Sequence, residues 1–245
     1  MKREIMKIGF IGLGNMATAM IGGMLQKGIA APEDIIGSAR TETTVEKVKT
    51  KFNINTTTDN KIVAAQADIL IVSIAAGRTL DYLKEAFGRP ELKLIRCMPN
   101  TPALVLEGCI GVCAEENVTE EDMEQVLALL RSFGIASVVP ERLMDVVVGV
   151  SGSSPAYVFM FIEAMADEAV AAGMPRKQAY EFAAQSVLGS ARMVLETGRH
   201  PGELKDMVCS PGGTTIQAVK VLEEKGMRAA VMDAMDACIE KSKSM

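Results

Sequence analysis

The first 150 residues alternate short apolar runs with longer stretches in which apolar residues recur every three or four positions. The short runs predict strands and the longer stretches predict amphipathic helices, because the two structures bury side chains with different periods. The expected strands cover residues 7–13, 35–38, 69–74, 94–98, 109–113 and 135–139. The expected helices cover residues 17–27, 43–52, 60–65, 78–87 and 120–132. This alternation predicts a doubly wound, Rossmann-type sheet whose ligand lies at the carboxyl ends of its strands.

After about residue 150 the strand pattern disappears and long helical patterns take its place. Ser154 and Pro155 are typical of a helix start, with the cap residue followed by proline at the first helical position. That helix extends to about residue 172, and a second helix ends at Gly198. Shorter helices follow near residues 202–208 and on both sides of Gly226. We therefore expect an α/β fold with a Rossmann domain at residues 1–150 and an all-helical domain at residues 151–245.

The first helix of the second domain is apolar over much of its surface, as the positions of Val158, Phe159, Phe161, Ile162 and Met165 indicate. A helix that is apolar on more than one face needs more than one packing partner. We expect a homodimer built through the helical domain. A self-contained helical bundle is the alternative, because burial on all sides can also be intramolecular.

A glycine turn follows the first expected strand, with the spacing Gly12-x-Gly14-x-x-Ala17. In a dinucleotide site the first glycine makes the tight turn, the second lets the backbone approach a pyrophosphate, and the small third residue lets helix and strand pack closely. The free N–H groups at the helix start also favour an anion. The alternative to a dinucleotide site is an ordinary strand–turn–helix in which the glycines serve only close packing. The expected cofactor contacts of this turn are Gly12, Leu13, Gly14, Asn15 and Met16.

The end of the second expected strand indicates which dinucleotide binds. A site for NAD usually places an acidic residue there, on the ribose 2′-hydroxyl. This strand ends instead with Ser38 and Arg40, a hydroxyl and a guanidinium that suit a 2′-phosphate. We therefore expect a preference for NADP(H), with NAD(H) as the second choice. The alternative for Arg40 is an ordinary exposed loop residue.

A second glycine turn lies in the helical half, where Ser210, Pro211, Gly212 and Gly213 precede Thr214 and Thr215. The helix expected after it would again expose backbone N–H groups to an anion. Since the first domain accommodates the dinucleotide, this second turn predicts a site for an anionic group of the substrate. Simple helix capping by Thr214 is the alternative.

Composition narrows the choice of partners. The chain has 245 residues, a net charge of −5 and no basic stripe, so we expect no nucleic acid partner. No run reaches the ~18 consecutive apolar residues of a membrane span, so we expect no membrane association. Five scattered cysteines without a C-x-x-C pair, beside the single His200, predict no metal site and a reducing, cytoplasmic location.

Candidates for proton transfer are sparse. His200 precedes Pro201 in an expected loop, which favours a turn residue over a catalyst, and no Tyr-x-x-x-Lys pair is present. The reaction therefore needs little acid–base chemistry from the protein. Hydride transfer from a nicotinamide to a C=N bond that is already protonated fits such a site, because the protein mainly positions both reactants.

Five stretches, at residues 11–17, 96–103, 151–157, 200–206 and 210–215, resemble the 1-pyrroline-5-carboxylate reductase family. The resemblance spans nearly the whole chain. It implies an NADPH-dependent oxidoreductase that reduces 1-pyrroline-5-carboxylate to L-proline in the last step of proline biosynthesis. It also implies a Rossmann domain with a helical dimerisation domain, assembled as dimers or as pentamers of dimers.

The resemblance also implies roles for single residues. Asn60 would contact the cofactor ribose, and the segment with Ile74 and Ala75 would line the cofactor. Thr215 would face the ring nitrogen of the substrate and is the expected catalytic residue. The nicotinamide would lie beside Cys97, Met98, Pro99 and Asn100, and the substrate carboxylate on the backbone of Ser210, Gly212, Gly213, Thr214 and Thr215.

Three positions depart from the family pattern. Ala75 and Ala76 stand where Lys-Pro is usual, Leu106 stands where Gly is common, and Ser154 replaces a Gly near the expected substrate loop. A related cyclic-imine reductase or a β-hydroxyacid reductase is an alternative function. The β-hydroxyacid class requires a catalytic lysine early in its helical domain, and residues 164–172 contain no lysine. A dinucleotide sensor without catalysis is another alternative, but it has no need for the second turn.

Overall fold

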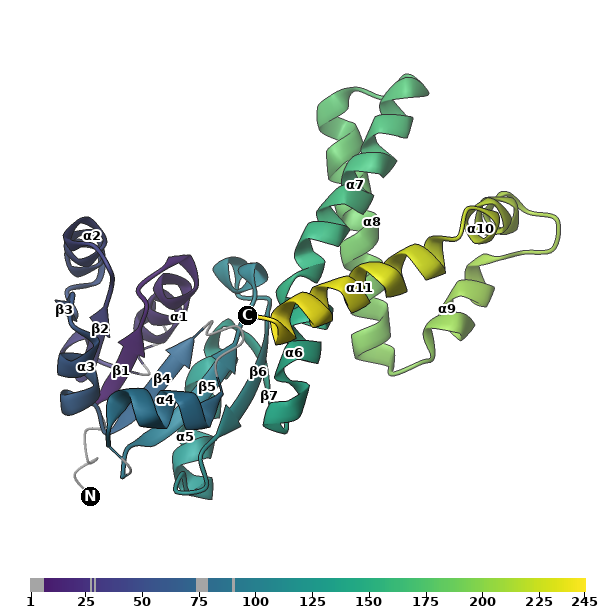
Figure 1. Cartoon of the computed structure of the whole chain (residues 1–245). Coiled ribbons are helices and arrows are strands. Elements are labelled where there is room, and N and C mark those ends of the chain that lie inside the picture. Colours follow the sequence, from purple (N-terminus) through teal and green to yellow (C-terminus); the bar gives the residue numbers. More distant parts are fainter. Residues whose placement is uncertain (1–6, 27, 29, 74–78, 90) are drawn as a thin grey trace. The chain divides into compact units, whose positions relative to one another are not determined.

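The computed structural model describes residues 7–245 apart from residues 27, 29, 74–78 and 90 (Figure 1). The chain forms two compact units. One unit consists of Met1–Pro155 together with Cys238–Met245, and the other consists of Ala156–Ala237. The C-terminal end of the chain therefore belongs to the same unit as the sheet.

A seven-stranded sheet forms the centre of the first unit, with the strand order β3-β2-β1-β4-β5-β6-β7. Strand β1 pairs in parallel with β2 on one side and with β4 on the other. The strand order reverses at this point, and in a doubly wound sheet the crevice beyond the carboxyl ends of such strands binds the ligand. The strands are β1 (Ile8–Ile11), β2 (Ile35–Ser38), β3 (Asn55–Thr57), β4 (Ile69–Ser73), β5 (Lys93–Met98), β6 (Gly108–Ala114) and β7 (Gly134–Val138).

Two features of the sheet differ from the sequence expectation. Strand β3 was not expected, because it is only three residues long and polar. Strand β6 is antiparallel to β5 and carries β7 in parallel beside it. The connection from β5 to β6 contains only the 3₁₀ helix Thr101–Val105, and a parallel crossover needs a dozen or more residues.

Helices cover the sheet on both faces (Figure 1). One cluster of buried residues joins α1 (Asn15–Gln26), α2 (Glu42–Phe52) and α5 (Glu120–Leu130) to the sheet. A separate cluster joins α3 (Asn60–Gln66), α4 (Leu80–Phe87) and α6 (Met144–Val147) to it. Two separate cores on one sheet are the mark of a doubly wound fold, and they confirm the predicted fold class.

The helical part of the chain begins about ten residues earlier than expected. A 3₁₀ turn at Glu141–Leu143 leads through α6 into a π-helical turn at Val148–Gly152 and then into α7 (Ser154–Ala171). Because Ser153 already has right-handed helical angles, Ser154 continues a helix and does not cap one. The predicted helix start at this point is confirmed, since α7 begins at Ser154, but Ser154 is the first helical residue and not a cap before it.

The second unit has little core of its own among the described residues. Its buried cluster consists of Ala166, Ala179 and Ala183, with a few partly buried neighbours. On α7, Phe159 and Met160 are 62% and 69% exposed. The unit therefore leaves large apolar surfaces uncovered and does not form the self-contained bundle of the alternative prediction. Its other helices are α8 (Arg176–Thr197), α9 (Pro201–Val208), α10 (Thr214–Glu224) and the part of α11 (Met227–Lys243) that precedes Cys238.

The helical run Glu141–Ala171 is long and apolar enough to cross a membrane when judged by length and composition alone. Its mean hydropathy is 1.4 over an 18-residue window, of which 11% is buried. The sequence scan for uninterrupted apolar residues did not detect this run, because glycines, serines and a proline at residues 149–155 and charged residues on both sides interrupt it. The exposed apolar surface of such a helix is typical of an interaction site, and either a second protein surface or lipid can bury it.

Candidate active site

The glycine turn at the end of β1 is built as the sequence predicts. Gly12 has a φ of +94°, a left-handed conformation that favours glycine, and α1 begins at Asn15. The N–H groups of Gly12 and Leu13 both donate to the carbonyl oxygen of Ser38, at 3.0 and 2.8 Å. The turn is thereby fixed to the carboxyl end of β2.

The space beside this turn fits a pyrophosphate. A Cβ atom added to Gly12 or Gly14 would meet no protein atom within 4 Å. The packing of the described chain therefore gives no reason for glycine at position 14, whereas close approach of a ligand does. The first N–H groups of α1, including those of Asn15 and Met16, have no acceptor within the helix and are suited to phosphate oxygens.

Both the backbone and the side chain of Leu13 make contacts within the protein. Its N–H group is bonded to Ser38, and its side chain is 2% exposed. The side chain lies against Gly37, where an added Cβ would come within 2.4 Å of Leu13 Cδ2. Leu13 therefore anchors the turn in the core, and Gly37 is a glycine whose importance the sequence pattern did not reveal.

The two residues expected at the 2′-phosphate lie in different environments. The Ser38 side chain is fully buried, and its hydroxyl donates to Asn60 Oδ1 at 2.7 Å. Direct contact between the Ser38 hydroxyl and a phosphate is therefore not supported. Arg40 is exposed just beyond β2. Asn60 is exposed at the start of α3, and its bond to Ser38 fixes the orientation of its amide.

The residues expected beside the nicotinamide lie at the carboxyl end of β5. Cys97, Met98 and Pro99 are all buried. Burial raises the pKa of the Cys97 thiol far above its ordinary value, which favours the protonated thiol. Ile74 and Ala75, also expected at the cofactor, lie outside the described residues.

Asn100 holds this segment in place. Its side chain is 8% exposed, accepts a hydrogen bond from Cys109 N at 2.9 Å and donates one to the carbonyl oxygen of Ser151 at 3.0 Å. Pro155 follows Ser151 by four residues and has no N–H group, so it cannot bond that carbonyl in the usual helical manner. Asn100 takes the place of the missing donor. Its side chain is therefore engaged in structure, and the expected direct contact with the cofactor is not supported.

The second glycine turn is an exposed loop with a defined backbone. Gly213 N donates to the carbonyl oxygen of Ser210 at 3.0 Å, and Gly212 has a φ of +69°. Proline at the second position and positive φ at the third fit a type II turn. A Cβ on Gly213 would lie 2.5 Å from Ser210 Oγ and 3.1 Å from the Ser210 carbonyl oxygen, so a side chain at this position would force Ser210 or the turn to shift.

Helix α10 begins directly after this turn without a side-chain cap. Its N-cap residue is Gly213, and Thr214 is the first helical residue. Capping by Thr214, the alternative explanation of this motif, is therefore absent. The N–H groups of Thr214 and Thr215 have no acceptor within the helix, and together with the helix dipole they are suited to bind a carboxylate.

His200 has the structural role that its position before proline predicted. It is the N-cap of α9, and its Nδ1 accepts a hydrogen bond from Gly202 N at 3.1 Å. Arg96 is a residue whose role the sequence analysis missed. It lies within the buried strand β5 and is 4% exposed. The signal was a charged residue between apolar neighbours in the strand expected at residues 94–98.

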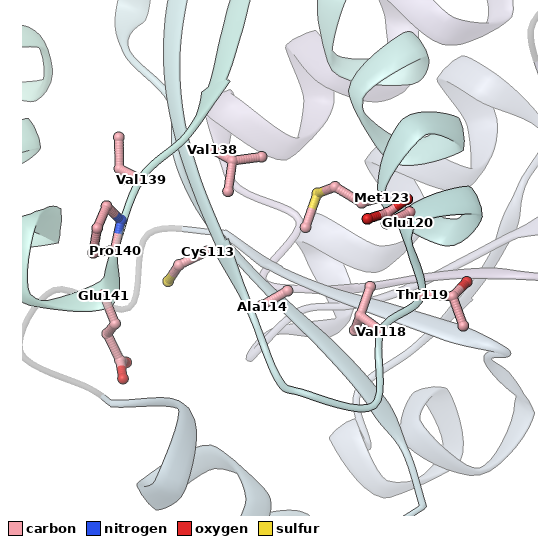
Figure 2. A pocket seen from close by; sticks show the side chains of 10 residues that line it. All are labelled: Cys113, Ala114, Val118, Thr119, Glu120, Met123, Val138, Val139, Pro140 and Glu141. Atoms are coloured by element: carbon pink, nitrogen blue, oxygen red, sulfur yellow. The ribbon is translucent and has the colours of Figure 1, made fainter.

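A pocket of about 490 Å³ opens in the first unit, where β6 and β7 end and α5 begins (Figure 2). Strands β6 and β7 run opposite to β5, and the register places Val138, at the end of β7, level with Val112 and Cys97. The lining of the pocket contains none of the residues expected at the dinucleotide. Its lining residues are Cys113, Ala114, Val118, Thr119, Glu120, Met123, Val138, Val139, Pro140 and Glu141.

Two family models match the chain. Residues 141–245 match the model described as pyrroline-5-carboxylate reductase dimerisation. Residues 7–95 match the model described as NADP oxidoreductase, coenzyme F420-dependent. The first match covers the helical part from Glu141 onward, including the exposed apolar helix α7.

Relatives match along the full length. The chain is 53% identical to pyrroline-5-carboxylate reductase of Escherichia coli strain K12 over 98% of both chains. It is 38% identical to the enzyme of that name from Arabidopsis thaliana, over 99% of this chain and 96% of the relative. Among solved structures, a pyrroline-5-carboxylate reductase of Coxiella burnetii is 31% identical with a TM-score of 0.86, over 98% of both chains. The Plasmodium falciparum enzyme, solved with NADP bound, is 30% identical with a TM-score of 0.83, over 98% of this chain and 97% of that chain.

Proposed function

Because this chain belongs to the pyrroline-5-carboxylate reductase family, we propose that it reduces 1-pyrroline-5-carboxylate to L-proline with NADPH. It is an NAD(P)H-dependent oxidoreductase of proline biosynthesis. The observation that carries the proposal is the identity of 53% to the Escherichia coli enzyme along 98% of both chains.

We propose that residues 1–150 bind the dinucleotide. The backbone of Gly12, Gly14, Asn15 and Met16 receives the pyrophosphate, and the space left beside both glycines supports this assignment. Arg40 receives the 2′-phosphate, since its guanidinium is exposed beyond β2. Asn60 contacts the ribose, with its amide oriented by Ser38. The backbone of residues 97–99 lies beside the nicotinamide.

We propose that residues 151–245 bind the substrate and form the dimer. The N–H groups at the start of α10 hold the substrate carboxylate, and the Gly212 turn shapes the loop around it. The Thr215 hydroxyl forms a hydrogen bond with the ring nitrogen and orients the imine. When bound, NADPH supplies a hydride, which the carbon of the protonated imine accepts to give the amine of proline.

We propose a homodimer in which a second copy covers the exposed apolar residues of the helical unit, and a pentamer of such dimers as the full assembly. The match of residues 141–245 to a dimerisation model supports the dimer. All five cysteines are free, which supports a cytoplasmic location.

The test is steady-state kinetics with purified protein. With 1-pyrroline-5-carboxylate present, NADPH absorbance should fall and proline should form, more efficiently than with NADH. A six-membered cyclic imine carboxylate serves as the comparison substrate, because Ser154 stands near the expected substrate loop. Folded protein that binds NADPH but turns over neither imine would refute the proposal and favour a sensor.

A further inference from the structure

Arg96 is a buried cation in the centre of the sheet. Its side chain is 4% exposed on β5, and it lies opposite Cys113 of β6 in the strand register. Its Nε atom has no hydrogen-bond partner among the described residues. A buried charge is costly unless an opposite charge lies close to it, so the surroundings of Arg96 must supply an anion.

Glu141 supplies that anion and makes a second contact. Its Oε1 atom lies 3.4 Å from Arg96 Nη1, and it accepts the Leu80 N–H group at 2.7 Å. Leu80 is the first residue of α4, where the N–H groups lack helical acceptors and a carboxylate is favourable. Figure 2 shows the Glu141 side chain extending away from Val138 and Met123. One carboxylate thus joins β5 to the first turn of α4.

The strand register places Arg96 close to the dinucleotide crevice, because it is level with Val72 of β4 and through it with Ile11, which directly precedes the glycine turn. The crevice is expected where the strand order reverses, between β1 and β4. The adenosine half binds toward β2, where Arg40 lies, so the nicotinamide half extends toward β4 and β5. Arg96 directly precedes Cys97, and α4 follows β4 in the chain. The carboxylate therefore holds elements that border the nicotinamide half only.

We propose that Glu141 is a positioning residue for the nicotinamide half of the cofactor. Through Arg96 it fixes the carboxyl end of β5, and through Leu80 it fixes the start of α4. This inference rests on the proposed function, because it takes the end of β5 as the wall beside the nicotinamide.

The test compares two ligands on Glu141→Ala. Loss of both contacts leaves Arg96 unpaired and the start of α4 uncapped, so the Kd for NADPH should rise about tenfold, as loss of one charged hydrogen bond does. Adenosine 2′,5′-bisphosphate reaches only the adenosine half, so its Kd should stay unchanged. Titration calorimetry of the purified protein measures both values.

Two further variants separate positioning from loss of structure. Glu141→Gln keeps an acceptor for Leu80 N–H but loses the charge, so its Kd for NADPH should lie between those of wild type and Glu141→Ala. Glu120→Gln changes a carboxylate that lines the same pocket at the start of α5 and should alter neither Kd. If Glu141→Ala does not fold, Glu141→Gln carries the test with the same pair of ligands.

A parallel rise of both dissociation constants would overturn the proposal, because it would mean a general loss of structure. No change in either constant would overturn it as well. These binding measurements do not depend on the imine. Wild-type protein that binds NADPH but does not reduce 1-pyrroline-5-carboxylate would refute the proposed function, whereas a failure of the Glu141 comparison would leave that function intact.

Discussion

The chain has two glycine turns that each precede a helix, and the two turns differ in the contacts that fix their conformation. The turn at Gly12 is bonded twice to the Ser38 carbonyl and anchored by the buried side chain of Leu13. The turn at Gly212 is exposed, and one bond between Gly213 and Ser210 closes it. The turn proposed for the cofactor is thus preformed by the sheet, whereas the turn proposed for the substrate carboxylate depends on its own backbone conformation.

The largest effect is expected at the second turn from Thr215→Ala. Loss of a hydrogen bond to the reacting imine should lower kcat on the order of a hundredfold, because such a bond acts in the transition state. The Kd for NADPH should not change, since the first turn is untouched. Stopped-flow and steady-state assays separate the two quantities. Thr214→Ala is the matched control, with its hydroxyl one residue away, and an equal loss in both variants would remove Thr215 from its role.

Gly213→Ala tests whether the shape of the exposed loop matters. The added methyl group would lie 2.5 Å from Ser210 Oγ and 3.1 Å from the Ser210 carbonyl oxygen, so the turn must shift. Overpacking of this kind costs ~1–3 kcal/mol, which corresponds to a rise of roughly five- to 150-fold in the KM for the imine. Combining it with Ser210→Ala should recover part of the loss. An unchanged KM would show that the carboxylate does not bind at this turn.

Gly14→Ala tests the first turn. The added methyl group meets no protein atom within 4 Å, so the melting temperature of the free protein should stay the same. The Kd for NADPH should rise about tenfold, because the methyl group occupies space that the pyrophosphate needs. Calorimetric melting and ligand titration measure the two effects.

The control for that variant is Gly37→Ala, whose methyl group would lie 2.4 Å from Leu13 Cδ2. It should lower the melting temperature before any ligand is added. A lower melting temperature in Gly14→Ala as well would mean that this glycine serves packing, and the contrast between the two positions would fail.

The smallest effect is expected from Leu106→Gly, at a position that departs from the family pattern. Leu106 has a φ of +65° and is 41% exposed. Relief of the left-handed strain, ~1–2 kcal/mol, outweighs the entropy that glycine adds to the unfolded chain, ~0.4–1 kcal/mol. The free energy of unfolding in urea should rise by about 0.5 kcal/mol. Leu104→Gly, in the same segment without a positive φ, should lower it.

Much of this architecture follows from local sequence pattern. Alternating apolar runs predicted the sheet and helices of the first unit, because a buried strand and an amphipathic helix each require a fixed side-chain period. Turn residues predicted both glycine turns, since only glycine adopts the backbone of Gly12 and Gly212 readily. The family resemblance supplied the reaction, which the comparisons confirm.

The tertiary structure decided which side chains remain free for ligands. The burial of Ser38 against Asn60, the engagement of Asn100 with Ser151 and the pairing of Arg96 with Glu141 all join residues distant in the chain. Local pattern specifies the conformation of a residue, but hydrogen bonds between distant segments form only when the sheet brings those segments together. The sequence by itself determined the helices, the strands and their turns. The packing of the sheet determined which polar groups form hydrogen bonds within the protein and which remain free to bind a cofactor.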